Sequence, residues 1–424
     1  MKKNILVFPC GSEIALEVYR SLKYSKHFNV FGASSVDDHG RFVFENYIGD
    51  LPFIQEASFI SILKDNIRRY NIDIIYPSMD SVIVKLKMFE KELGCIVICS
   101  PLETTQICLS KLLTYVTFKD VVRVPVVYSI NTIKKYPVFV KPIIGYGSRG
   151  AKKINTYDEL NIYMSDAPDS IITEFLSGKE YTLDCFTDRK GNLKYFGARE
   201  RRRISNGISV NTVPIKDFQG KFYEILKEIN KKLVFRGAWF IQLKENSLGD
   251  FVLMEIASRL GGSSCLYRNK GINFAQLSIF DALGYDVEIL ENDYTIELDR
   301  ALNSVYKIPI KYEEVFLDFD DCLIIEKFFF NTDIIKFIFQ CFNQEINVTI
   351  LSRNDGDLSL RLRELNIYNL FSRVIQIPKN AKKSDYIDNP NSIFIDDSFA
   401  ERKDVYLNLH IPVFSPDMVE SLIA

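Results

Sequence analysis

Residues 137–150 read PVFVKPIIGYGSRG, and they are the most informative stretch of the chain. The apolar, β-branched run at residues 138–140 predicts a buried strand. Lys141 follows that run, and three glycines then occur within six residues, with Ser148 among them. A lysine at a strand end can hold a phosphate, and a glycine loop can bring backbone N–H groups close to an anion. The stretch is neither a P-loop nor a GxGxxG fingerprint. It predicts a phosphate site, and the alternative is a hairpin turn with an exposed lysine.

Two further motifs follow downstream. Residues 171–184 read IITEFLSGKEYTLD, and residues 254–264 read MEIASRLGGSS. A strand-end lysine, a glycine loop, an E-x-L segment, a second Glu and E-x-x-x-R before a glycine pair together resemble the ATP-grasp superfamily. The synthetase unit of the carbamoyl-phosphate synthetase large chain is the most similar branch, and the resemblance covers about residues 1–300. It implies ATP and Mg²⁺ as cofactors and an ATP-dependent ligase that joins small carboxylate and amine (or related) substrates through an acyl phosphate.

The resemblance also implies a nucleotide site. Its residues come from one helix, the strand end, the glycine loop and the E-x-L region, and they are Lys111, Lys141, Gly147, Ser148, Glu174, Leu176 and Glu180. Backbone groups around Glu174 and Leu176 would pair with the adenine edge. The carboxylate of Glu180 would accept from the ribose hydroxyls, because it is a double acceptor. Lys111 would contact the phosphates, and its alternative is a solvated helix lysine.

A predicted hairpin carries the metal ligands. Its strands span residues 237–243 and 251–256, which would place Gln242 opposite Glu255. By resemblance, Glu255 binds Mg²⁺ through oxygen, and Gln242 is a neutral ligand at the other metal position. The family usually has E-x-N here, but Ala257 replaces the Asn. One Mg²⁺ ligand is therefore missing, which predicts a weaker or displaced second metal.

Arginines are expected to complete the site. By resemblance, Arg259 stabilises the charge on the transferring γ-phosphoryl group. Residues 199–203, RERRR, form the densest charge run in the chain. At least one of these arginines would clamp a carboxylate or acyl phosphate, while the alternative is a solvated hairpin end. The pattern does not single out one of them.

The first hundred residues alternate strands and helices. A strand at residues 4–8, a Gly-containing turn and a helix at 13–24 form a Rossmann-like opening. The glycine fingerprint is missing, so no dinucleotide is predicted. Ser78 and Asp80 follow a predicted strand, where open α/β sheets bind ligands, although a capped turn is the alternative. In ATP-grasp proteins the matching domain helps to form the acceptor-substrate pocket.

A second pattern begins beyond about residue 310. Its predicted strands span residues 315–317, 348–351 and 393–395, and the polar residues that follow them are Asp318, Asp320, Ser352, Asp396 and Asp397. Lys382 and Lys383 lie between the last two strands. Clustered carboxylates at a sheet edge need a cation, and Mg²⁺ suits oxygen ligands. The order D-x-D, Ser, Lys, DD resembles the haloacid dehalogenase (HAD) superfamily, which implies a doubly wound α/β domain.

The HAD resemblance implies a Mg²⁺-dependent phosphatase. Asp318 would be the nucleophile that forms an aspartyl-phosphate, and Asp320 the general acid–base. Ser352 and a lysine, with Lys383 favoured over Lys382, would hold the phosphoryl oxygens. The four aspartates of the motifs would form the metal site.

Two features set this region apart from the usual HAD pattern. Cys322 stands where the family usually has Thr, which removes a hydroxyl hydrogen bond but no charged motif residue. About thirty residues separate Asp318 from Ser352, and Ser352 from Lys383, which leaves no room for a cap domain. An open site of this kind suits a large or tethered phosphorylated substrate.

Composition excludes several classes of protein. The 424 residues are 47% hydrophobic and 25% charged, and the net charge of −2 gives no reason to expect nucleic acid or an anionic membrane as partner. No apolar run approaches the roughly 20 residues that span a bilayer. The eight cysteines contain no CxxC pair, which favours a reducing cytoplasm. None of the three histidines lies in a motif, so neither a His-based zinc site nor a Ser–His–Asp triad is expected.

The sequence therefore predicts three domains. They are a Rossmann-like pre-ATP-grasp domain at residues 1–100, an ATP-grasp domain at 101–310 and a capless HAD-like domain at 311–424. Together they would form a bifunctional cytoplasmic ligase and phosphatase. The alternatives are a kinase–phosphatase pair without ligation, and a nucleotide-binding regulatory protein with non-catalytic domains.

Overall fold

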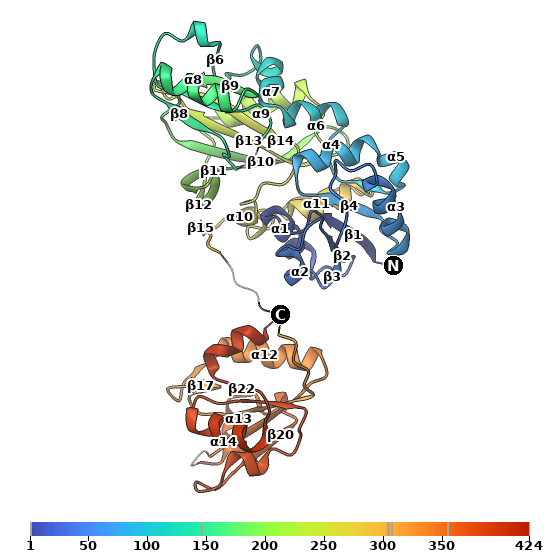
Figure 1. The fold of residues 1–424 in the computed structure, drawn as a ribbon, viewed down its shortest axis with the longest axis vertical. Coiled ribbons are helices and arrows are strands. Elements are labelled where there is room, and N and C mark those ends of the chain that lie inside the picture. The colour runs from blue at the N-terminus through green and yellow to red at the C-terminus, as the bar shows by residue number, and fades with distance from the viewer. Residues whose placement is uncertain (1, 146, 303–305, 307, 354–355, 424) are drawn as a thin grey trace. The chain divides into compact units, whose positions relative to one another are not determined.

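The computed structural model describes residues 2–145, 147–302, 306, 308–353 and 356–423. The chain divides into two compact units, Met1–Leu302 and Asn303–Ala424 (Figure 1). The first unit thus contains the region expected at residues 1–100 and, up to Leu302, the region expected at residues 101–310.

A five-stranded parallel sheet opens the first unit, in the order β3-β2-β1-β4-β5. Its strands are β1 (Lys3–Phe8), β2 (Phe28–Ala33), β3 (Asn46–Ile48), β4 (Ile74–Pro77) and β5 (Ile96–Val97). Its helices are α1 (Glu13–Leu22), α2 (Gly40–Val43), α3 (Phe59–Arg69), α4 (Asp80–Met88) and α5 (Glu90–Leu93). Apolar residues face both sides of β1, so Ile5 packs in one core cluster and Leu6 in another. This is the Rossmann-like arrangement that the alternation predicts.

Two antiparallel sheets form the rest of the first unit. The four-stranded sheet has the order β6-β9-β7-β8, and the six-stranded sheet has the order β14-β13-β10-β11-β12-β15. The strands of the smaller sheet are β6 (Val127–Tyr128), β7 (Val138–Pro142), β8 (Lys152–Ile154) and β9 (Ser170–Glu174). Those of the larger sheet are β10 (Glu180–Thr187), β11 (Leu193–Ser205), β12 (Ile208–Ile215), β13 (Gly237–Glu245), β14 (Phe251–Ala257) and β15 (Leu298–Asp299).

Helices cover these sheets. They are α6 (Leu102–Leu109), α7 (Lys111–Phe118), η1 (Ile130–Thr132), α8 (Tyr157–Asp166), α9 (Lys221–Lys232), α10 (Cys265–Arg268) and α11 (Phe274–Ala282). On α9 the buried residues Phe222, Leu226 and Ile229 recur at helical spacing and pack in one cluster with Leu183 of β10. Helix α11 instead joins the core of the N-terminal sheet, where Ile279 shares a cluster with residues of β1. This shared core explains why the first 302 residues form one unit.

The second unit contains a five-stranded parallel sheet in the order β20-β19-β16-β21-β22. Its elements are β16 (Glu314–Leu317), β17 (Ile324–Ile325), β18 (Phe329–Phe330), α12 (Thr332–Asn343), β19 (Asn347–Ser352), α13 (Leu358–Glu364), η2 (Tyr368–Leu370), β20 (Arg373–Gln376), η3 (Lys383–Tyr386), β21 (Ser392–Ile395), α14 (Phe399–Leu409), β22 (Val413–Phe414) and η4 (Pro416–Leu422). Val315 and Leu317 pack in a cluster with Phe337 of α12, while Phe316 packs with Val405 of α14. Helices therefore cover both faces of this sheet, as a doubly wound sheet requires.

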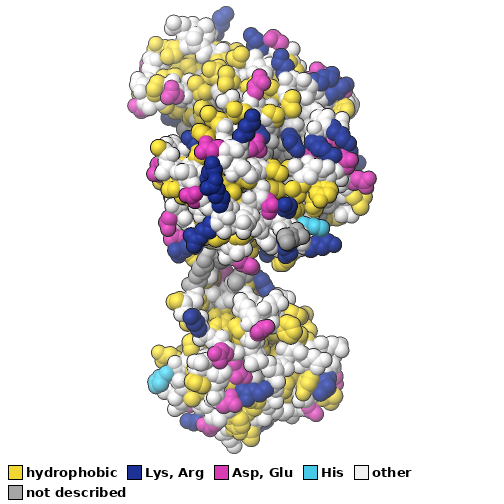
Figure 2. Space-filling model, turned by 90° about the vertical axis from the view of Figure 1, so that its right-hand side faces the viewer, with side chains coloured by type: hydrophobic (Ala, Val, Ile, Leu, Met, Phe, Trp, Pro, Cys, Tyr) yellow, Lys and Arg dark blue, Asp and Glu magenta, His cyan; other side chains and the backbone are white. Residues whose placement is uncertain are grey.

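Charges of both signs lie on the surface of each unit. The face drawn in Figure 2 carries Lys and Arg side chains together with Asp and Glu side chains. Within the described part of the chain, no helix combines the length and the apolar character needed to cross a bilayer.

Candidate functional site

A cavity in the first unit is lined by residues of both antiparallel sheets. Its lining includes Lys111, Phe139, Lys141, Pro142, Gly145, Gly147, Ser148, Arg149, Ala151, Glu180, Arg201, Gln242, Leu243, Met254 and Glu255. Seven residues that the sequence nominated for ATP or Mg²⁺ are among them: Lys111, Lys141, Gly147, Ser148, Glu180, Gln242 and Glu255.

Strand alternation explains why the polar residues meet. On β10 the odd-numbered Tyr181 and Leu183 enter the core beneath α9, so Glu180 lies on the opposite face. On β13 the same alternation buries Ile241 in that core and turns Gln242 toward the cavity. The expected pairing is also present, because Gln242 lies opposite Glu255 in the β13–β14 register. Among the described residues, the Glu255 carboxylate has no hydrogen-bond or ion-pair partner.

Lys141 is buried at the end of β7, with 5% of its surface exposed. Its Nζ donates to Tyr115 Oη at 2.6 Å, and that hydroxyl donates to the Met254 carbonyl at 2.8 Å. Burial, reinforced by the neighbouring Lys111 charge, lowers the pKa of Lys141 to about 8. No carboxylate of the described residues forms an ion pair with this ammonium group, so an anion in the cavity would stabilise its charged form.

The glycine stretch is the connection between β7 and β8. The stretch is therefore a hairpin loop, but its lysine is buried and not exposed, and the phosphate site stays a prediction. The Lys111 ammonium group donates to the Gly145 carbonyl at 2.9 Å and so ties α7 to this loop. Gly147 and Ser148 adopt φ angles of 62° and 53°, in the left-handed region that glycine tolerates best. Tyr146 lies outside the described residues.

Glu180 is held by two cations. Its Oε1 accepts from Lys244 Nζ at 2.7 Å, and its Oε2 accepts from Arg201 Nη1 at 3.0 Å. The same Arg201 nitrogen donates to Gln242 Oε1 at 2.9 Å. Reasoning from sequence did not identify Arg201 or Lys244 individually. The period of two along a strand could have separated Arg201 from Arg202 but not from Arg203, because a register shift between Arg201 and Arg203 interrupts the alternation.

The RERRR run is divided by the geometry of β11. Arg199 forms a buried ion pair with Asp184 at 2.7 Å, and Arg201 reaches the cavity. Arg203 pairs with Asp299 at 2.7 Å on the surface. Two arginines of the run therefore face inward, and a solvated hairpin end describes only its outer part.

The E-x-L residues lie apart from the lining of this cavity. The Glu174 side chain accepts from the Val126 N–H at 3.1 Å, and the Glu174 N–H donates to the Val126 carbonyl at 3.0 Å. These contacts fasten the segment to the chain before β6. The expectation that backbone groups around Glu174 and Leu176 pair with the adenine edge stays a prediction. Leu176 is buried, with 4% of its surface exposed.

Arg259 follows β14 and also lies outside the cavity lining. Its Nε donates to Asp80 Oδ2 at 2.9 Å, and its Nη2 lies 2.8 Å from the same oxygen. Its guanidinium also lies over the Phe240 ring, 5.4 Å from the centroid. Asp80 is the first residue of α4, directly beyond β4. The structure thus joins two residues that the sequence nominated separately.

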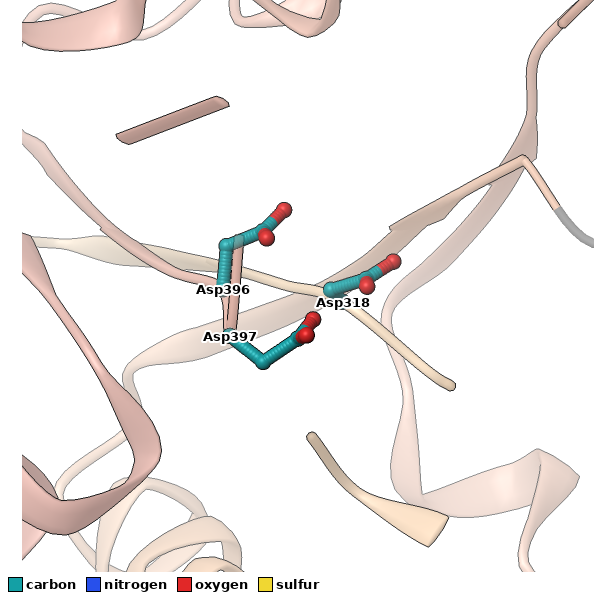
Figure 3. Close-up of side chains that lie close together, drawn as sticks. All are labelled: Asp318, Asp396 and Asp397. Carbon is teal, nitrogen blue, oxygen red and sulfur yellow. The ribbon is translucent and has the colours of Figure 1, made fainter. Parts of the chain in front are cut away.

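Three carboxylates gather at the carboxyl edge of the sheet in the second unit. One oxygen from each of Asp318, Asp396 and Asp397 lies within 4.8 Å of the others, and Figure 3 shows the three side chains together. They follow β16 and β21, which are adjacent parallel strands. Burial and the neighbouring Asp318 charge raise the pKa of Asp396 to about 6. The same two causes raise the pKa of Asp397.

Lys383 is the cation of this cluster. Its Nζ lies 2.7 Å from Asp318 Oδ1 and 2.6 Å from Asp396 Oδ2. Burial opposes its charge, but Asp318 and Asp396 together raise the pKa of Lys383. Lys382 is exposed and pairs instead with Asp404 at 3.4 Å, so the structure places Lys383 and not Lys382 in the cluster.

The other nominated residues of the second unit lie around these carboxylates. Ser352 ends β19, the strand adjacent to β16, and is buried. Asp320 is exposed and stands outside the three-carboxylate group. Cys322 is buried, with its Sγ 3.9 Å from the Ile395 carbonyl, and burial raises the pKa of its thiol.

Sequence comparison relates part of the first unit to known proteins. Residues 166–301 match the family model described as "ATP-grasp in the biosynthetic pathway with Ter operon". The chain is 28% identical over 193 residues to the vancomycin/teicoplanin A-type resistance protein VanA of Enterococcus faecium, which covers 38% of this chain and 56% of that protein. It is 24% identical over 189 residues to the carbamoyl phosphate synthase large chain of Streptomyces coelicolor, covering 41% and 17%. The chain thus spans about half the length of the first relative and far less of the second.

Structural comparison extends the likeness to 69% of the chain. The biotin carboxylase domain of Hydrogenobacter thermophilus 2-oxoglutarate carboxylase, solved with MgADP and bicarbonate, has a TM-score of 0.59 at 15% identity, with 72% of that chain covered. N5-carboxyaminoimidazole synthetase from Staphylococcus aureus has a TM-score of 0.56 at 17% identity, with 81% of that chain covered. L-amino acid ligase from Bacillus licheniformis has a TM-score of 0.55 at 17% identity, with 75% covered. At these identities the likeness concerns the fold.

The predicted cofactors agree with these findings, because ATP-grasp enzymes bind ATP and Mg²⁺ and several of the structural neighbours hold ADP or an ATP analogue. The first unit therefore has the fold of the ATP-grasp enzymes, and its residues 166–301 match an ATP-grasp family in sequence.

Proposed function

We propose that the first unit is an ATP-dependent ligase that activates a small carboxylate as an acyl phosphate and transfers the acyl group to an amine or a related nucleophile. One observation carries the proposal: a single cavity collects Lys111, Lys141, the glycine loop, Glu180, Gln242 and Glu255. These residues come from five separate elements, and only the fold brings them together. A ligase among the structural neighbours, the L-amino acid ligase, supports the same reaction class.

The residues present fit a nucleotide with Mg²⁺. Lys141 is buried without a carboxylate partner, and Glu255 is a carboxylate without a partner among the described residues, so each lacks the charge that MgATP would supply. Glu255 and Gln242 would hold Mg²⁺ through oxygen, with Lys111, Lys141, Gly147 and Ser148 around the phosphates. Glu180 would contact the ribose, and the segment from Glu174 to Leu176 the adenine. Mg²⁺, when bound, offsets negative charge on the phosphates.

Arg259 would stabilise negative charge on the transferring phosphoryl group. Asp80 holds its guanidinium from the carboxyl edge of the N-terminal sheet, where open α/β sheets bind ligands. We place the carboxylate and amine substrates at the end of the cavity nearest Arg259 and Asp80. Residues 1–100 would form part of the acceptor pocket and residues 101–310 the ATP-grasp domain.

Nucleotide binding at this cavity can be tested directly. Lys141→Met removes the buried ammonium group, and Lys152→Met is a matched control on β8, where the side chain is exposed. Calorimetric titration with MgADP should show a loss of about 10- to 100-fold in affinity for Lys141→Met only, because a charged hydrogen bond to phosphate is lost. Equal affinities in the two variants would remove Lys141 from the site.

For the second unit, residues 311–424, we propose a Mg²⁺-dependent phosphatase of the HAD type. The cluster of Asp318, Asp396 and Asp397 supports it, because three carboxylates within 4.8 Å form a fitting oxygen site for Mg²⁺. Asp320 would complete the metal site. The unit would act on a phosphorylated substrate, intermediate or product of the same pathway.

The phosphatase chemistry would proceed in two steps. A carboxylate oxygen of Asp318 attacks phosphorus and the ester oxygen leaves, taking a proton from Asp320. Water then attacks the aspartyl-phosphate, Asp320 takes a proton back, and inorganic phosphate leaves. Lys383 and Ser352 would hold the phosphoryl oxygens. Mg²⁺-dependent release of phosphate from an aryl phosphate, abolished in Asp318→Asn, tests this assignment.

Two alternatives predict different outcomes. A kinase–phosphatase pair would form a phosphorylated product and ADP without joining two substrates. A nucleotide-binding regulatory protein would bind ATP without acid-dependent turnover.

We also propose a cytoplasmic location, which is supported by the eight cysteines, all of them free thiols.

A further inference from the structure

Arg201 lines the cavity and contacts Gln242, the side chain that the sequence nominated for the other metal position. Only 7% of its side chain is exposed. Its Nη1 contacts Glu180 Oε2 at 3.0 Å and Gln242 Oε1 at 2.9 Å, and its Nη2 donates to the Gly207 carbonyl at 2.8 Å. The guanidinium thus lies between the two side chains proposed for the ribose and the metal.

The metal ligands around Arg201 are few. Glu255 is the one carboxylate on the β13–β14 hairpin that lines the described cavity, since its register partner Gln242 is neutral. Ala257 offers no oxygen at the position two residues further on. The Gln242 oxygen already accepts from Arg201, which uses one of its two lone pairs. Oxygen ligands for one Mg²⁺ are present, but a second ion would have to compete with a guanidinium.

Arg201 is not needed merely to neutralise Glu180. Lys244 already donates to the other oxygen of that carboxylate at 2.7 Å. Glu180 therefore has a cation besides Arg201, and the Arg201 charge remains available to an anion in the cavity.

We propose that Arg201 replaces the second Mg²⁺ of the nucleotide site, so that this chain binds the triphosphate with one metal ion and one guanidinium. The inference rests on the proposed function of the first unit. Arginine suits the task because its charge is permanent and its planar fork can bind two phosphate oxygens together. Its bond to Gly207 also ties it to the β11–β12 turn, which lies against the glycine loop.

The experiment counts ions and measures affinity separately. The full-length chain is titrated with Mn²⁺, followed by electron paramagnetic resonance, with and without a non-hydrolysable ATP analogue. The difference isolates the ions that depend on the nucleotide from any ion held by the second unit. One analogue-dependent Mn²⁺ per chain is expected in the wild type.

Variants then test the guanidinium. Arg201→Met should weaken binding of the analogue about 10- to 100-fold and Arg201→Lys by less, because a lysine keeps the charge but not the fork. Arg203→Met is the matched control on the same strand, where the arginine is exposed and pairs with Asp299. Adenosine, which lacks phosphates, should bind Arg201→Met and the wild type alike, which a purely structural role for Arg201 would not produce.

The possible results distinguish failure of the Arg201 inference from failure of the proposed function of the first unit. Two analogue-dependent Mn²⁺ ions in the wild type would overturn the inference, and so would an Arg201→Met affinity within about twofold of the wild type. The ion count stands even if Arg201→Met does not fold. Failure of the wild type to bind the analogue at all would instead overturn the proposed function, and the inference with it.

Discussion

Asp80 and Arg259 lie 179 residues apart in the chain, yet the carboxylate of one accepts a hydrogen bond from the guanidinium of the other. We expect Asp80 to act as a positioning residue. Asp80→Asn keeps the size of the side chain but removes its charge, so Arg259 should lose its fixed orientation. ADP formation should slow, while the affinity for MgADP should not change.

Arg259→Met serves as the reference for that experiment. It should lower turnover about 100-fold, because its charge partner develops only in the transition state. Measured kcat and the dissociation constant for MgADP separate the two effects. An Asp80→Asn variant that binds MgADP more weakly but turns over normally would contradict the positioning role.

We expect Lys141 to make nucleotide binding depend on pH. Burial, followed by the Lys111 charge, lowers its pKa to about 8 from the ordinary 10.5. Bound phosphates favour the charged amine, so near pH 9 the site should take up a proton when MgADP binds, and affinity should fall as the pH rises above about 8. Calorimetry in two buffers of different ionisation enthalpy measures this uptake. It should vanish in Lys141→Met and persist in Lys152→Met.

The lowered pKa of Lys141 also determines how the free energy of unfolding should change with pH. Between about pH 8 and 10.5 the unfolded chain binds more protons at this position than the folded chain. The free energy of unfolding should therefore rise with pH across that window, and the Lys141 contribution should be missing in Lys141→Met. Denaturant unfolding at several pH values, compared with Lys152→Met, provides the check.

At the scale of elements, the β11–β12 turn lies against the glycine loop that lines the cavity. A Cβ atom added at Gly207 would lie 2.5 Å from the Gly147 carbonyl carbon, a contact with backbone that cannot yield easily. Gly207→Ala should push the two elements apart and weaken MgADP binding.

Gly191, in the turn between β10 and β11, provides the control. Both glycines have positive φ angles, 77° and 84°, but an added Cβ at Gly191 has no neighbour within 4 Å. Each alanine should cost about 1–2 kcal/mol of folding stability from its backbone conformation. Only Gly207→Ala should also lose nucleotide affinity, and equal affinities in the two variants would show that the contact between the turn and the glycine loop does not affect binding.

The local sequence pattern was sufficient to predict most of the strands and helices that carry the candidate site residues. The period of β10 and β13, with the hairpin that follows, placed Gln242 opposite Glu255, and the apolar runs of the second unit marked its central strands. Contacts between segments that are distant in the sequence could not be predicted from local pattern. The side-chain partners of Arg201 lie on other strands, and that of Arg259 is the first residue of helix α4, so no local pattern encodes them. Strand β3, three residues at a sheet edge, was too short to show a period.

At the scale of the whole molecule, the two units carry separate groups for chemistry. The carboxylate cluster and Lys383 lie within Asn303–Ala424, and the cavity proposed for the nucleotide lies within Met1–Leu302. Asp318→Asn should therefore abolish phosphate release from aryl phosphates and leave ATP-driven chemistry intact. Loss of ADP formation in a folded Asp318→Asn protein would mean that the two sites are coupled.

The central claim is that the first unit forms an acyl phosphate, and the fate of oxygen tests it most directly. The full-length chain is incubated with MgATP, an amine and a panel of small carboxylic acids, including amino acids, that carry ¹⁸O in the carboxylate. Mass spectrometry then follows the phosphate and nucleotide products. An acyl phosphate predicts ADP and inorganic phosphate that contains one ¹⁸O from the acid, because the C–O bond of the acyl phosphate breaks when the amine attacks. Unlabelled phosphate, or AMP with pyrophosphate, would contradict the claim.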